Sequence, residues 1–177
     1  DQNPGDNRLE AFRFDRDYKV GLVLFDQVLG YQSARASARA SDPALVGQAP
    51  EGADLIGTGG AVTGAAYLYP RIKFNLRKWV DLYGGPLFAF STAKLTDPFN
   101  TRLGGGTARN ALGGTPGSYL GTELDLGLQV KCQPIEAITI TTTVEGGYFV
   151  PGDAFNTAAG APMSSVYFGR VRLGVKL

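Results

Sequence analysis

The chain has 177 residues, and its 17 basic side chains nearly balance its 16 acidic ones. This balance argues against nucleic acid as a partner, because nucleic-acid binding usually needs a clearly basic face. The sequence contains no His and a single Cys, Cys132, so the usual zinc and thiolate sites and the His-dependent catalytic triads are absent, and we expect no metal, no cofactor and no enzymatic activity.

The N-terminal half contains segments in which apolar and polar residues alternate, the pattern of β-strands with two different faces. Asp26–Val62 is a long insertion between them, and within it Ser33–Ala40 is predicted as a short surface helix. Pro70 and Pro86 lie inside predicted strands, where proline cannot donate to the ladder, so we expect bulges or gaps. The predicted strands are Leu9–Phe14, Tyr18–Phe25, Thr63–Leu76 and Trp79–Ser91.

The C-terminal half carries the clearest pattern, in Tyr119–Cys132. There leucines such as Leu124 and Leu126 alternate with carboxylates such as Glu123 and Asp125. The segment is longer than the roughly 5–6 residues usual in soluble domains, and it reaches the roughly 9–11 residues that a strand needs to cross a bilayer. Two further predicted strands follow it, Ile135–Val150 and Ser165–Leu177.

The predicted connections alternate between short and long. Short turns on one side and long loops on the other are typical of bacterial outer-membrane barrels, whose short turns are periplasmic. No run of about 18 apolar residues occurs, so no transmembrane helix is predicted. A membrane barrel needs no such run, because only alternate residues of its strands meet lipid. The short turns lie near Asp15–Asp17, Arg77–Lys78 and Gln133–Pro134, and the long loops are Asp26–Val62, Thr92–Ser118 and Pro151–Ser164.

The alternation also assigns side chains to two faces. The apolar face is predicted to meet outer-membrane lipid, and a charge placed on it near the midplane would cost roughly 2–4 kcal/mol. A soluble β-sandwich that binds a ligand is another interpretation. Apolar rows on nearly every strand argue against it. The residues predicted to face outward are Leu120, Leu124, Leu126, Leu128, Ile138, Ile140, Val171, Leu173 and Val175.

The opposite face collects charged residues, eight basic against four acidic. Two interpretations stay open: the charges pair across strands in a solvated wall, or the basic residues form an anion-selective path, as rings of Arg or Lys do in pores. Glu123 and Asp125 point the same way and could run acid–base chemistry, but without a nucleophile or metal set beside them we interpret them as lumen carboxylates. The basic set is Arg13, Lys19, Arg71, Lys73, Lys131, Arg170, Arg172 and Lys176, and the acidic set is Asp81, Glu123, Asp125 and Glu145.

Three patches are similar to a known family. EAFRFDRDYKVGLVLF (Glu10–Phe25), GTELDL (Gly121–Leu126) and GYFVPGDAF (Gly147–Phe155) resemble the C-terminal part of alginate-export-type outer-membrane barrels and related myxobacterial-type barrels. The resemblance implies a porin-like barrel of about 16–18 strands with an electropositive lumen that passes an anionic polysaccharide. The expected function is therefore an outer-membrane porin or export-channel component for an anionic solute or polysaccharide. The alternative is a structural outer-membrane barrel that anchors an envelope or surface assembly.

The number of predicted strands bears on how the barrel closes. The chain, residues 1–177, forms one barrel domain or segment with seven predicted strands, whereas bacterial single-chain barrels have an even number and cannot leave open edges in lipid. We expect an all-β antiparallel transmembrane β-barrel of which this is the C-terminal part. Its partners would be the N-terminal part, as a separate chain or as sequence not included here, and envelope-complex subunits. The alternative is a complete eight-stranded barrel with one strand unrecognised.

Overall fold

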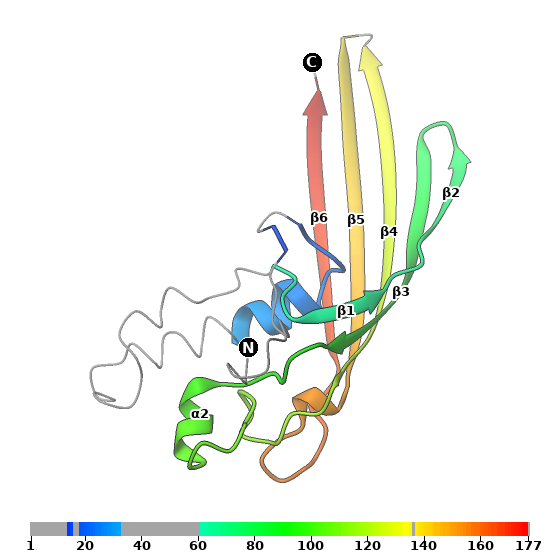
Figure 1. Cartoon of the computed structure of the whole chain (residues 1–177). Helices are drawn as coiled ribbons and strands as arrows, with labels where there is room; N and C mark the ends of the chain where they lie inside the picture. The colour runs from blue at the N-terminus through cyan, green and yellow to red at the C-terminus, as the bar shows by residue number, and fades with distance from the viewer. Residues whose placement is uncertain (1–13, 16–17, 33–60, 136, 177) are drawn as a thin grey trace, which may run out of the picture.

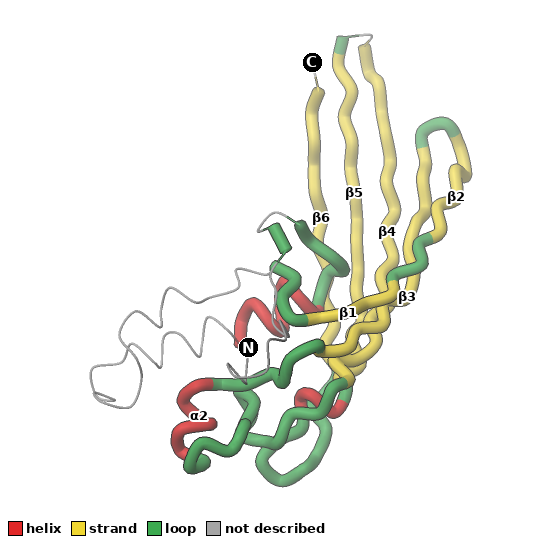
Figure 2. Tube along the Cα trace, in the orientation of Figure 1, coloured by secondary structure: helices red, strands yellow, loops and turns green. Residues whose placement is uncertain are grey.

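The computed structural model describes residues 14–15, 18–32, 61–135 and 137–176. These residues form one antiparallel sheet of six strands with a few short helical segments (Figure 1, Figure 2). The all-β class is therefore confirmed. None of the helices in the described ranges is long and apolar enough to cross a membrane.

Each strand pairs antiparallel with its neighbour in the order β1-β3-β4-β5-β6, and β2 also pairs with β3. The predicted strands from Trp79 onward are confirmed within a few residues at their ends, while the predicted strand Thr63–Leu76 is divided into β1 and β2. The strands are β1 Ala65–Leu68, β2 Ile72–Arg77, β3 Val80–Ser91, β4 Tyr119–Ile135, β5 Ile138–Pro151 and β6 Val166–Lys176, and the helical segments are η1 Leu24–Leu29, α2 Pro98–Leu103 and η4 Asp153–Phe155.

The division between β1 and β2 lies at Pro70. The pairs Leu68–Phe88 and Ile72–Gly84 leave residues 85–87 of β3 facing the interruption, so Pro86 lies opposite the same gap. A Cβ atom on Gly85 would lie 2.0 Å from the carbonyl oxygen of Pro70, so only glycine permits this approach. The expected gap in the ladder is confirmed, and both prolines lie where a missing N–H donor costs little.

The segment Tyr18–Phe25 is not a strand, and the prediction for it was wrong. The chain turns at Gly21, which has φ 69°, and enters the short π-helical segment η1. Val23, Leu24 and Phe25 are almost fully buried. An apolar run buried on all sides has no polar face to mark its period, so strand and buried helix look alike in the sequence. The predicted helix Ser33–Ala40 and the predicted strand Leu9–Phe14, apart from Phe14, lie outside the described residues.

The apolar core lies between η1 and the half of the sheet that contains β1, the end of β3, the start of β4 and the end of β5. Figure 1 shows where these strand ends lie in the sheet. Leu87 and Ala89 of β3 and Phe149 of β5 pack there with the residues of η1. The Phe149 and Phe155 rings meet edge to face at 5.9 Å, a favourable aromatic geometry. The η1 segment is therefore held against the sheet by burial of apolar surface on both partners.

The long connections of residues 92–118 and 152–165 lie at one end of the sheet, and the short turns between β2 and β3 and between β4 and β5 lie at the other (Figure 1). Buried Asn110 joins two of these loops: its amide nitrogen donates to the carbonyls of Ala154 and Asn156, and its oxygen accepts the N–H groups of Leu112 and Gly114. All the polar atoms of this side chain are thus used, and residues 92–118 are locked to residues 152–164.

Candidate functional site

One face of the sheet, called here the apolar face, exposes rows of large apolar side chains. The register places one such row across five strands. Val171 and Leu173 on β6 are 70% and 72% exposed, and Leu126 on β4 is 57% exposed. Leu124, Leu128 and Val175 are exposed as predicted, and Ile138 and Ile140 lie half-buried on the same face of β5. The row consists of Phe74, Leu82, Leu128, Val144 and Val171.

Leu120 was predicted on the apolar face, and that prediction was wrong. Ala89 pairs with Gly121 and Phe90 with Tyr119, so Leu120 is an extra residue in the ladder. This β-bulge interrupts the alternation, and Gly121 adopts φ 136°, a backbone conformation that favours glycine. Leu120 turns into the core, where it is 2% exposed.

The opposite face, called here the polar face, carries the four predicted carboxylates Asp81, Glu123, Asp125 and Glu145, and all four are buried. A soluble two-layer protein shows the reverse arrangement, with apolar residues inside and charges in water. Because a buried charge is costly unless it is paired and hydrogen-bonded, the partners of each carboxylate define what this face does.

Glu123, which is 0% exposed, binds the backbone of the segment before η1. Its Oε1 accepts the N–H groups of Leu22 at 2.5 Å and Val23 at 2.8 Å, and its Oε2 accepts that of Leu24 at 2.7 Å. These N–H groups lie where a helix begins and lack partners inside the helix. Glu123 is therefore a structural clamp between β4 and η1, which leaves its carboxylate no free oxygen for acid–base chemistry.

Asp125 lies beside this clamp and is 4% exposed. Its Oδ2 accepts the hydroxyl of Tyr69 at 2.6 Å, while Oδ1 has no hydrogen-bond partner among the described residues. A Cβ atom on Gly147 would lie 2.8 Å from Oδ1, so glycine on β5 makes room for the carboxylate.

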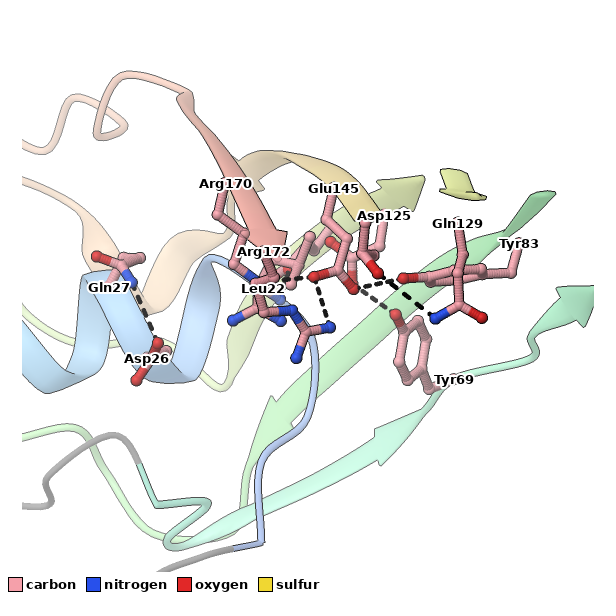
Figure 3. A network of polar contacts seen from close by, with 12 residues as sticks. Leu22, Asp26, Gln27, Tyr69, Tyr83, Asp125, Gln129, Glu145, Arg170 and Arg172 are labelled. Carbon is pink, nitrogen blue, oxygen red and sulfur yellow. Dashed lines mark hydrogen bonds and ion pairs between the residues drawn. The ribbon is translucent and has the colours of Figure 1, made fainter. Parts of the chain in front are cut away.

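Glu145 is the centre of a network formed by β3, β5 and β6 (Figure 3). Tyr83 donates its hydroxyl to Oε1 at 2.7 Å, and Arg170 and Arg172 reach Oε2 at 2.7 and 2.9 Å. The Tyr83 ring lies over Gly127, where an added Cβ atom would stand 2.3 Å from Cζ. Glycine at this position therefore lets tyrosine cross β4 and reach β5.

Asp81 forms a second shared ion pair nearer the short turns. Lys73 on β2 and Lys131 on β4 lie 3.1 and 3.3 Å from its Oδ2, and Asn75 donates to Oδ1 at 2.5 Å. The interpretation that charges pair across strands therefore holds for these side chains. Asp81 and Glu145 are each shared by two cations, so positive charge remains in excess at both clusters.

A cavity of about 550 Å³ opens on the polar face. It brings together five of the eight residues of the predicted basic set, Lys19, Arg71, Lys73, Arg170 and Arg172, with the carboxylates Asp125 and Glu145. Neither Asp81 nor Glu123 lines it, and Arg13 lies outside the described residues. The cavity has the volume of a small-molecule site and a predominance of cations.

Tyr69 and Tyr83 also line the cavity, and no pattern in the sequence singles them out. The Arg71 guanidinium lies over both rings, 5.3 Å from the centroid of Tyr69 and 5.6 Å from that of Tyr83. Both tyrosines occupy polar positions of the alternating pattern. Their cross-strand neighbours were needed to assign them a role, because Tyr83 faces Gly127 only in the observed register.

Comparisons with family models, with curated proteins and with solved structures found no match. The described residues also contain no group of His, Cys, Asp and Glu that could hold a metal ion. The arrangement on the two faces of the sheet is therefore the basis for the functional argument.

Proposed function

We propose that this chain forms part of the wall of a β-barrel in a bacterial outer membrane and contributes to a channel for an anionic solute. The observation that carries the proposal is the inversion of the sheet: leucine, valine and phenylalanine rows are exposed, while carboxylates are buried opposite them. Exposed apolar patches of this extent mark a surface that another apolar phase or partner covers. In a membrane β-barrel the bilayer covers such a face, and lipid-facing residues alternate with interior-facing ones along each strand.

Loop placement supports the same proposal. Short turns join β2 to β3 and β4 to β5 at one end, and the long segments with α2 and η4 lie at the other end (Figure 1). In outer-membrane barrels the short turns are periplasmic and the longer loops extracellular. The sheet would then span the membrane with Asn110 and its loop contacts outside the cell.

A barrel also requires a closed sheet, and closure sets a condition on further strands. Within the described ranges, β6 pairs only with β5, and β1 and β2 pair only with β3. The successive antiparallel pairings make β2, β4 and β6 run in the same direction. Because open edges do not occur in lipid, an antiparallel barrel needs an odd number of additional strands between β6 and the β1–β2 edge.

The charge on the polar face supports an anionic solute. The cavity is lined by five cations and two carboxylates, and basic rings favour anions in pores. A second candidate function is a structural barrel that anchors an envelope or surface assembly. It is favoured by η1, which fills part of the polar face with apolar core and leaves less space for a lumen.

The test of membrane insertion compares two substitutions on β4. Leu126→Arg places a charge on the apolar face, where it should cost roughly 2–4 kcal/mol near the midplane, and it should impair folding into lipid vesicles. Gln129→Arg places the same charge on the polar face and should fold like the wild type. Equal folding of both variants, or a wild type that stays in the aqueous phase without detergent, would contradict the proposal. Conductance in a planar bilayer separates the channel from the structural barrel.

A further inference from the structure

The cations of the cavity differ in whether a carboxylate neutralises them. Lys73 shares Asp81 with Lys131, and Arg170 and Arg172 share Glu145. Arg71 lines the same cavity, is exposed, and has no carboxylate within ion-pairing distance among the described residues. The charge of Arg71 is therefore not offset by an ion pair of its own.

Arg71 is nevertheless held in place. It lies directly after Pro70 in the gap between β1 and β2, and its guanidinium rests over the rings of Tyr69 and Tyr83. Both rings are fixed in turn, because the Tyr69 hydroxyl donates to Asp125 and the Tyr83 hydroxyl donates to Glu145. Cation–π contacts hold the plane of a guanidinium while its N–H donors stay available at the edge.

We infer that Arg71 is the central residue of an oxyanion-binding site, which takes the carboxylate or phosphate group of a small solute in this cavity. A guanidinium offers two parallel N–H donors that match the paired oxygens of such a group. Binding to a preformed site avoids the cost of ordering a mobile side chain. Arg172, which is 59% exposed and shares its carboxylate with Arg170, lines the same cavity and adds positive charge.

The inference deepens the proposed function, since it names the residue and the chemical group by which the channel would recognise its solute. It also separates Arg71 from Lys73, Arg170 and Arg172, whose first role is to complete ion pairs between neighbouring strands. Binding of an oxyanion does not require conductance, so the two proposals can fail separately.

The test measures binding of ¹³C-acetate and of inorganic phosphate to the purified full chain in detergent, by NMR line broadening at neutral pH. The variants are Arg71→Gln, Arg71→Lys and, as the matched control, Arg77→Gln, which changes an arginine at the end of β2 that does not line the cavity. We expect Arg71→Gln to weaken binding at least about tenfold and Arg71→Lys to weaken it less, because lysine keeps the charge but loses the planar fork. Arg77→Gln should bind like the wild type.

The outcomes assign the ligand as well as the site. If only acetate binds in an Arg71-dependent way, the site takes a carboxylate. If only phosphate does, it takes a phosphate group, and if both do, it is a general oxyanion site. Wild-type protein that binds neither anion, or Arg71→Gln protein that binds like the wild type with an unchanged circular dichroism spectrum, would overturn the inference. A protein that binds through Arg71 but does not insert into lipid would contradict only the proposed function.

Discussion

The clamp formed by Glu123 gives the sharpest prediction about stability. Glu123→Ala leaves the N–H groups of Leu22, Val23 and Leu24 without their acceptor. An unsatisfied buried donor costs roughly 1–3 kcal/mol, so the three together could cost roughly 3–9 kcal/mol. Removing the carboxylate also relieves the cost of burying its charge, and the N–H groups can reach water if η1 detaches. We therefore expect a loss near the lower end, about 3 kcal/mol.

Glu123→Gln should lie between the wild type and Glu123→Ala. The amide oxygen can still accept two N–H groups, as Oε1 does for Leu22 and Val23, but the amide nitrogen is a donor that cannot serve Leu24. Urea unfolding in detergent measures the free energy of unfolding. Amide hydrogen exchange at residues 22–24 reports whether η1 detaches before the sheet unfolds.

Gln129→Ala is the control for the clamp, because it changes the same strand and removes one long hydrogen bond, of 3.4 Å, to Thr143. It should change the free energy of unfolding by less than about 0.5 kcal/mol. If Glu123→Ala matched this control in both stability and exchange, the clamp would not be what holds η1 to the sheet.

Two further predictions concern the polar face. Gly127→Ala should destabilise the protein by roughly 1–3 kcal/mol in urea unfolding, because the new Cβ atom would stand 2.3 Å from the Tyr83 ring; Gly146→Ala, whose Cβ would meet only the Phe168 carbonyl at 3.7 Å, is the control and should cost less. If the protein conducts, neutralising Arg71, Lys73, Arg170 and Arg172 together should shift the reversal potential toward cations in a salt gradient, with Arg71→Gln alone giving most of the shift. An unchanged reversal potential in an open pore would exclude these residues as selectivity determinants.

The strands were predictable where each had two different faces. In β4, Leu124, Leu126 and Leu128 alternate with Glu123 and Asp125, so the period of two gave both the strand and the faces. The sequence was uninformative for Tyr18–Phe25, because apolar residues on every side remove the alternation. The face of Leu120 was predicted wrongly for a local reason: a bulge adds one residue to the strand and moves this side chain to the other face.

The candidate site was predictable only in its charges. Alternation placed Arg71, Lys73, Arg170 and Arg172 on one face, and the structure brings them to one cavity. Their pairing depends on cross-strand register, which no single strand specifies. The partner of Glu123 is a stretch of backbone about a hundred positions earlier in the chain. Such a contact leaves no signal in residue type, because any non-proline residue donates the same N–H group.

Accessibility along β4 tests the central claim most directly. Spin labels on single cysteines at residues 124, 126 and 128 to 131, in a Cys132→Ser background, can be exposed in lipid vesicles to oxygen, which dissolves in the bilayer, and to a water-soluble nickel chelate. We predict that labels at Leu124, Leu126, Leu128 and Val130 collide with oxygen and those at Gln129 and Lys131 do not, a period of two along the strand. Labels that all meet the nickel chelate equally, or that show no alternation, would contradict a lipid-facing sheet.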